Sequence, residues 1–94
     1  PWGLWVADAA TGEARRIWQA PPTPRGSPPT TDGGTNLHWS ARDRIIFSSY
    51  ADGWPHLYSV PPAGGEPLLL TPGRYMVEHV RLTPDGAHVV FAAN

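Results

Sequence analysis

Residues 37–60 read LHWSARDRIIFSSYADGWPHLYSV, and this stretch decides the fold class. Short apolar runs centred on Trp39, Phe47 and Tyr58 are separated by polar segments that contain Asp, Ser, Gly and Pro. Runs of roughly 4–8 residues rich in aromatic and β-branched side chains, bounded by turn residues, are typical of β-strands. The stretch therefore predicts three consecutive strands connected by a turn and a loop.

The same pattern continues over the rest of the chain and predicts an all-β protein. The chain has 12 prolines and 10 glycines, which argue against long helices. Segment 20–35 is interrupted by prolines that cannot donate ladder hydrogen bonds, so it is expected to be a loop. Eight short strands are expected, at residues 2–8, 13–19, 36–40, 44–50, 56–60, 66–71, 76–83 and 87–93.

Parts of the sequence repeat at fixed offsets. Leu57-Tyr58 and Gly65-Glu66 repeat Leu4-Trp5 and Gly12-Glu13 with an offset of 53 residues. Val89-Val90-Phe91 repeats Ile45-Ile46-Phe47 with an offset of 44 residues. The first interval is longer because it contains the proline-rich segment. Four strands in roughly 40–50 residues is the spacing of a propeller blade.

The repeat therefore predicts a fragment of an antiparallel β-propeller. Residues 1–19 are expected to hold the last two strands of one blade. Residues 36–71 are expected to form a full blade, and residues 76–94 the first two strands of the next blade. A β-sandwich is the alternative, because it also uses short antiparallel strands. The fixed offsets favour the propeller. Because the chain starts at Pro1, it is expected to be part of a longer protein.

Composition argues against several classes of partner. The net charge is −1, lysine is absent and no basic run occurs, so nucleic acid is not an expected partner. No apolar run approaches the roughly 20 residues of a membrane span, so no membrane is expected. There is no cysteine, and His38, His56, His79 and His88 lack the spacing of metal ligands. No metal and no cofactor are expected.

The lengths of the connections predict which end of the fragment is functional. Successive connections in an up-and-down sheet alternate between its two ends. One end receives the longer segments 20–35, 50–55 and 72–75, and the other receives the tight turns 9–12, 41–43, 61–65 and 84–86. Binding residues gather on loops that a rigid scaffold holds in place. We therefore expect the long-loop end to face a substrate or another domain.

Two segments resemble known families. Thr83-Pro84-Asp85-Gly86, followed by Val89-Val90-Phe91, resembles the propeller repeats of the bacterial TolB type. DGWPHLY at 52–58, LTPG at 70–73 and Val77-Glu78 resemble a run in the N-terminal propeller of the dipeptidyl-peptidase IV branch of the prolyl oligopeptidase family. This likeness covers residues 37–94 and extends only weakly to the first strands.

The resemblance implies a parent serine peptidase whose propeller covers an α/β-hydrolase domain, in the cytoplasm or periplasm of a bacterium. Its implied partners are the rest of the propeller, that C-terminal domain, a peptide substrate and further copies in a homo-oligomer. The family's nucleophile lies in a G-x-S-x-G motif. This chain has no such motif, so it is not expected to be an enzyme by itself. The alternative is a TolB-like module that binds proteins and has no peptidase activity.

Three residues are candidates for the substrate channel. Glu78 is expected on the inner strand of its blade, where it would line the central channel. Arg25 could hold a substrate carboxylate or carbonyl, or could simply be solvated. Trp54 could be a stacking platform or a wedge between blades. Structural roles are expected for Asp52, Gly53, His56, Tyr58, Asp85 and Gly86; among these, Asp52-Gly53 has an alternative interpretation as a substrate-facing loop.

Overall fold

A computed structural model describes residues 2–29 and 36–94, and they form an antiparallel all-β fold without α-helix. The strands lie in three sheets, of two, four and two strands, and within each sheet the strands that follow one another in sequence pair. This is a β-propeller fragment made of a half blade, a full blade and a half blade, and the ring is not closed. The strands are β1 (Gly3–Ala7), β2 (Ala14–Gln19), β3 (Leu37–Trp39), β4 (Ile45–Ser49), β5 (His56–Val60), β6 (Leu68–Leu69), β7 (Val77–Leu82) and β8 (Val89–Ala93).

The strand expected at residues 66–71 and the proline-rich segment differ most from what the sequence predicts. The expected strand at 66–71 is reduced to β6, because Pro67 lacks an N–H and the pairing changes after Leu69. The Leu70 N–H still donates to the Leu57 carbonyl, but the Leu57 N–H donates to the Thr71 hydroxyl instead of to a backbone carbonyl. The proline-rich segment contains one turn of 3₁₀ helix, η1 (Pro24–Gly26).

The core lies on both faces of the four-stranded sheet. On one face, Phe47, Tyr58 and Val60 pack against Leu4 and Ile17 of the first half blade. On the other face, a second cluster brings Ile46 and Leu57 against Val77 of the last half blade, with Val80, Leu82 and Val89 packed around them. Burial on both faces explains why Ile45, Ile46 and Phe47 are all apolar and all buried, where a sheet with one solvated face would alternate.

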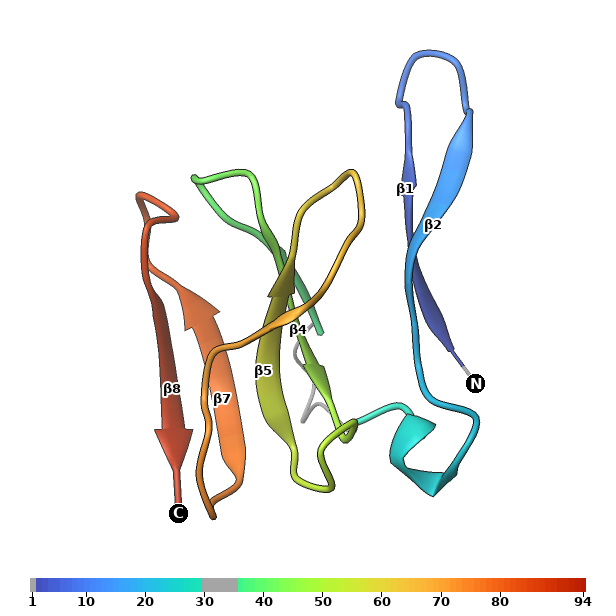
Figure 1. Cartoon of the computed structure of the whole chain (residues 1–94). Helices are drawn as coiled ribbons and strands as arrows, with labels where there is room; N and C mark the ends of the chain where they lie inside the picture. Colours follow the sequence, from blue (N-terminus) through green and yellow to red (C-terminus); the bar gives the residue numbers. More distant parts are fainter. Residues whose placement is uncertain (1, 30–35) are drawn as a thin grey trace.

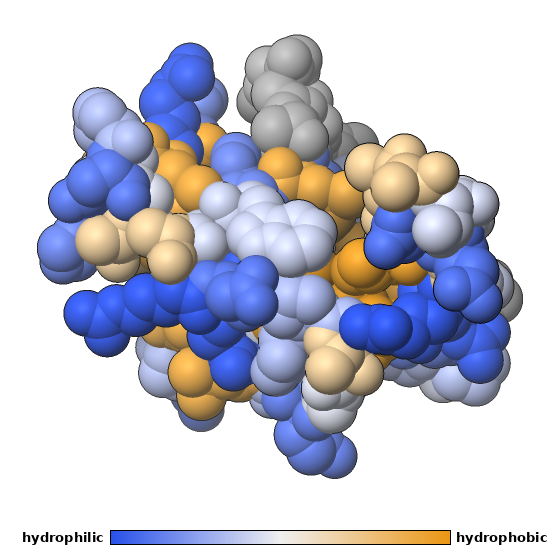
Figure 2. Space-filling view, turned by 90° about the horizontal axis from the view of Figure 1, so that it is seen from above, coloured by the Kyte–Doolittle hydropathy of each residue, from blue (hydrophilic) through white to orange (hydrophobic). Residues whose placement is uncertain are grey.

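The two ends of the molecule differ in only one connection. The β2–β3 connection spans residues 20–36, whereas every other connection spans residues 8–13, 40–44, 50–55, 61–67, 70–76 or 83–88, so the general difference in length that the sequence predicts is not observed. In Figure 1 the β1–β2, β3–β4, β5–β6 and β7–β8 turns lie at the top, and η1 and the β4–β5 and β6–β7 connections lie at the bottom. Figure 2 looks down on the end at the top of Figure 1, where hydrophilic turns alternate with apolar side chains that reach the surface between them. The end that carries the long β2–β3 connection is called the long-loop end below.

Candidate functional site

His56 is the centre of the polar contacts at the long-loop end. It is the first residue of β5 and only 1% exposed. Its Nδ1 lies 2.6 Å from Oδ2 of Asp52, and its Nε2 lies 3.0 Å from the backbone carbonyl of Tyr75. Each ring nitrogen therefore lies within hydrogen-bond distance of an oxygen from a different loop. One side chain thereby ties the β4–β5 loop to the β6–β7 connection.

Asp52 and Gly53 shape the β4–β5 loop around this histidine. Oδ1 of Asp52 accepts the N–H of Trp54 at 3.1 Å, which is the local turn that Asp residues favour. Gly53 has a φ of 92°, a conformation that costs glycine little, and its N–H donates to the Tyr50 carbonyl at 2.7 Å. Asp52 therefore uses one carboxylate oxygen for the loop and the other for His56.

Two aromatic rings contact the His56 ring. Trp54 is stacked with it at a centroid distance of 6.2 Å and an interplanar angle of 16°. Tyr75 contacts it at 5.4 Å in a tilted arrangement. Trp54 remains 38% exposed, so part of its ring faces solvent at the long-loop end. Asp52, Trp54, His56, Thr71 and Tyr75 are called the His56 cluster below.

Backbone hydrogen bonds extend this cluster into the next blade. The buried Thr71 hydroxyl accepts the Leu57 N–H at 2.9 Å. The Val77 N–H, at the start of β7, donates to the Pro55 carbonyl at 3.0 Å. The DGWPHLY and LTPG segments thus form a connection between the full blade and the half blade that follows it.

Tyr58 lies beneath the cluster on β5. Its ring stacks on Phe47 with a centroid distance of 5.9 Å. Burial, followed by the negative charge of Asp52, raises the pKa of the Tyr58 hydroxyl above its ordinary value. The phenol therefore stays neutral at physiological pH and adds no second negative charge beside Asp52.

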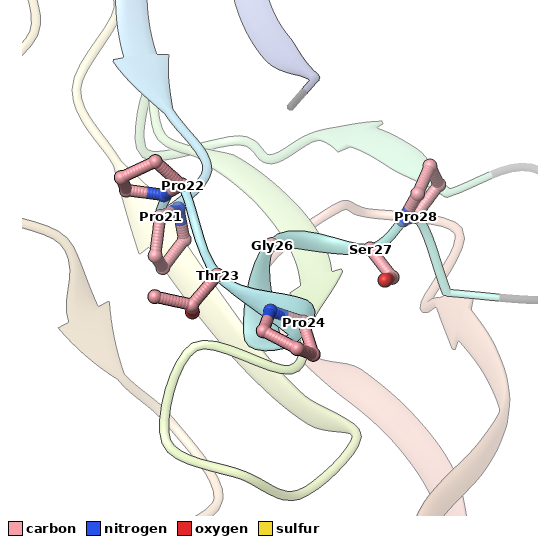
Figure 3. Close-up of a pocket in the computed structure, with 7 residues that line it drawn as sticks. All are labelled: Pro21, Pro22, Thr23, Pro24, Gly26, Ser27 and Pro28. Carbon is pink, nitrogen blue, oxygen red and sulfur yellow. The ribbon is translucent and has the colours of Figure 1, made fainter.

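Arg25 is brought to the same loop from a distant part of the sequence. It lies on η1 and is exposed, and its guanidinium lies about 3.5 Å from where a Cβ on Gly53 would sit. Figure 3 shows η1 beside the β4–β5 loop. A pocket of about 440 Å³ at η1 is lined by Pro21, Pro22, Thr23, Pro24, Gly26, Ser27 and Pro28. The part of the proline-rich segment at 30–35 lies outside the described residues.

Glu78 is placed near this end by the direction of β7. It is the second residue of β7, which starts at the long-loop end in Figure 1, and it pairs with Ala92. Its side chain is 54% exposed, and Oε2 lies 3.8 Å from Nε2 of His79. His79 has a φ of 55°, and the register of β7 shifts between Glu78 and Arg81. The strand is therefore irregular next to Glu78.

Asp85 and Gly86 lie at the opposite end, in the β7–β8 turn. Oδ1 of Asp85 accepts the Thr83 hydroxyl at 2.6 Å and the Ala87 N–H at 3.1 Å. The hydrogen bond from Thr83, followed by that from Ala87, lowers the pKa of the Asp85 carboxyl. The Gly86 carbonyl accepts the Ala41 N–H at 2.9 Å, so this turn also contacts the β3–β4 turn of the full blade.

The sequence did not assign roles to Thr71, Tyr75 or Arg44. Thr71 lies in the LTPG segment that the sequence singles out, but the sequence does not indicate that its hydroxyl accepts the Leu57 N–H. Tyr75 contributes a backbone carbonyl, which no residue pattern identifies. Arg44 donates from Nε to the Ser59 hydroxyl at 2.8 Å and from Nη2 to the Ser59 carbonyl at 3.0 Å.

Comparison with known proteins gave no relatives. No protein-family model, no curated protein and no solved structure matches the chain. Within residues 2–29 and 36–94, no group of three or more His, Cys, Asp or Glu side chains is placed to hold a metal ion. In the same described part of the chain, no helix has the length and apolar character needed to cross a bilayer.

Proposed function

We propose that this chain is a non-catalytic propeller segment of a serine peptidase that resembles the dipeptidyl-peptidase IV branch. In that role its long-loop end would position or gate peptide substrates over a separate α/β-hydrolase domain. The observation that carries the proposal is the His56 cluster, because the residues of the DGWPHLY and LTPG segments act there as one hydrogen-bonded unit. The cluster holds the β4–β5 and β6–β7 connections in fixed relative positions.

The exposed groups around the cluster suit an extended peptide. Arg25 offers several N–H donors to a carboxylate or carbonyl, and the exposed part of Trp54 offers an apolar surface. Glu78 offers an acceptor on the innermost strand of its blade. The bond cleavage itself is assigned to another domain, because the chain has no G-x-S-x-G motif to supply a nucleophile.

The first test has two parts: sequencing the full gene that encodes this chain, and assaying the full-length product for peptidase activity. A G-x-S-x-G motif downstream, with hydrolysis of X-Pro or X-Ala chromogenic peptides by the full-length product, would support the proposal. A product that lacks the motif and is inactive on X-Pro, X-Ala and N-acylated substrates would overturn it. Activity on N-acylated substrates alone would indicate an acylaminoacyl peptidase with the same kind of propeller.

The second test asks whether the long-loop end contacts substrate. Deletion of residues 21–33 in the full-length protein should raise KM for peptide substrates. The point variant Arg25→Ala should raise KM in the same direction, whereas Arg42→Ala, an exposed arginine in the β3–β4 turn at the opposite end, should leave it unchanged. Unchanged kinetics in the deletion variant would remove the long-loop end from the substrate path.

The second candidate function is a TolB-like protein-binding module. The observation that favours it is the open, proline-lined pocket beside η1, which carries no charged side chain. An inactive full-length product that captures a defined protein partner, and loses it when residues 21–33 are deleted, would support this function instead.

A further inference from the structure

Both ring nitrogens of the buried His56 face oxygen atoms. Nδ1 lies 2.6 Å from Oδ2 of Asp52, and Nε2 lies 3.0 Å from the Tyr75 carbonyl oxygen. A backbone carbonyl and an ionised carboxylate can only accept hydrogen bonds, and a neutral imidazole carries a single N–H. A neutral ring beside an ionised Asp52 can therefore make only one of these two bonds, and it turns a lone pair toward the other oxygen.

One additional proton on the Asp52–His56 pair satisfies both oxygens. It can reside on the ring, which then donates from both nitrogens, or on Asp52, whose hydroxyl then donates to Nδ1 while Nε2–H donates to the Tyr75 carbonyl. The two arrangements hold the same number of protons, so the pair titrates as a unit. The Asp52 side chain is 32% exposed and the His56 side chain only 1%, so the proton exchanges with water on the Asp52 side.

Other ionisable groups surround this pair, and one of them needs a control. On the described segments nearby they are Arg25 on η1, Tyr50 in the β4–β5 loop, Tyr58 on β5, Arg74 and Tyr75 in the β6–β7 connection, and Glu78 and His79 on β7. The arginines keep their charge at every relevant pH. Burial, followed by the charge of Asp52, raises the pKa of the Tyr58 hydroxyl, so that group stays neutral. His79 is a second imidazole, and the experiment below separates it from His56.

We propose that the Asp52–His56 pair makes the long-loop end sensitive to pH. With the additional proton bound, the ring joins the β4–β5 loop to the β6–β7 connection. When the proton is lost to water, the one remaining N–H stays on Nδ1, because a hydrogen bond to a carboxylate is stronger than one to a neutral carbonyl. The Tyr75 carbonyl then loses its donor, and the β6–β7 connection is released. This behaviour is independent of the proposed peptidase role, because it rests only on the contacts of one ring.

The amide of Val77 reports on this contact. Val77 follows Tyr75 by two residues, and its N–H donates to the Pro55 carbonyl, next to His56, at 3.0 Å. Release of the β6–β7 connection exposes this amide to water, and hydrogen exchange measures such local opening. The range from pH 5 to pH 9 spans the ordinary titration of histidine. After correction for the intrinsic effect of pH on exchange, protection at Val77 should fall at least about tenfold over this range, while amides in β4 keep theirs.

Asp52→Asn is the decisive variant, because its amide supplies the donor that the carboxylate lacks. Its Oδ1 can still accept the Trp54 N–H, and its Nδ2 can donate to Nδ1 of a neutral ring. The ring then keeps Nε2–H for the Tyr75 carbonyl, and both contacts persist without the additional proton. Protection at Val77 in this variant should therefore change by less than about twofold from pH 5 to pH 9.

His79→Asn is the matched control. His79 is exposed and lies two residues beyond Val77, and asparagine tolerates its φ of 55° better than most residues. This variant should keep the pH response of the wild type. A response that disappears in His79→Asn would assign the effect to His79 and overturn the proposal.

Nitrogen NMR of the imidazole rings gives an independent measurement that needs no Asp52 variant. The His56 signals are assigned as those that disappear in His56→Leu, and they should change with the same midpoint as the protection of Val77. Val77 protection that is independent of pH in the wild type would overturn the proposal. So would an Asp52→Asn variant with the wild-type response, or His56 ring signals that stay constant from pH 5 to pH 9.

Discussion

At the residue scale, one buried side chain connects two loops and two blades. His56 hydrogen-bonds Asp52 within its own loop and the Tyr75 carbonyl in the next connection. Replacing it removes both hydrogen bonds, but the Asp52 side chain is 32% exposed and can be hydrated instead. An acceptor that loses its partner costs free energy where water cannot take the partner's place, which applies here to the half-buried Tyr75 segment.

His56→Leu should therefore lower the free energy of unfolding by roughly 1–3 kcal/mol, because the hydrogen bonds that join the two connections are lost. Urea denaturation of the wild type and the variant measures the difference. His88→Leu is the matched control, since His88 is exposed and its hydrogen bonds with the Thr83 hydroxyl use only its backbone. Equal losses in the two variants would mean that the His56 cluster does not hold the loops together.

A pH dependence is expected at Asp85. Its folded-state pKa is lowered by the hydrogen bonds from Thr83 and Ala87, so its contribution to stability is present above the unfolded value of about 4. That contribution is lost as the pH falls through the lower folded-state pKa. The difference in Tm between wild type and Asp85→Asn should therefore shrink when the pH is lowered from 6 to 2. A difference that stays constant over this range would contradict the assignment.

At the element scale, tertiary contacts decide the lengths of the strands and the path of the loops. Five consecutive positions of β4 pair with β5, but β5 pairs with β6 at only two positions before Thr71 replaces the backbone acceptor. Composition predicted the proline-rich segment to be a loop, and it also contains η1. A single 3₁₀ turn has no hydrophobic period of its own, so the sequence pattern could not indicate it.

Gly26 is the position at which η1 can be tested. A Cβ at this residue would lie 1.8 Å from the Pro21 carbonyl oxygen, so the two segments would have to separate. Gly26→Ala should displace η1 from the β4–β5 loop and increase proteolysis within residues 20–29. Gly12→Ala is the control, since a Cβ there meets no atom within 4 Å, although its φ of 79° adds local strain. Equal proteolysis of the two variants would show that the close approach at Gly26 is unimportant.

At the scale of the whole molecule, the sheets are held together by side chains that face each other across blades. Phe47 is fully buried, with its ring 4.6 Å from Trp18 and 6.3 Å from Trp2 of the first half blade. Contacts of this kind join sheets that share no backbone pairing. The stability of the fragment therefore depends on the faces of the sheets as well as on their ladders.

Phe47→Ala should cost about 3–5 kcal/mol and alter the near-ultraviolet circular dichroism of the tryptophans, because it leaves a cavity between two blades. Leu68→Ala removes a 55%-exposed side chain of the same sheet and should change stability by less than about 1 kcal/mol. A Phe47→Ala variant with the stability and spectrum of the Leu68→Ala variant would mean that the two blades do not pack as described.

The fold class and the order of half blade, full blade and half blade were predictable from the amino-acid sequence alone, because strand-length apolar runs and fixed offsets are visible in the order of the residues. The sequence also marked Asp52, Gly53 and His56 as a group, since they stand together in one segment. Only the tertiary structure decided that His56 reaches the Tyr75 carbonyl, that Thr71 replaces a ladder acceptor, and that Arg25 lies beside Gly53. These contacts join segments that are distant in sequence, and they involve backbone atoms and the paths of loops. Such contacts depend on how the whole chain packs, so no local pattern of residues indicates them.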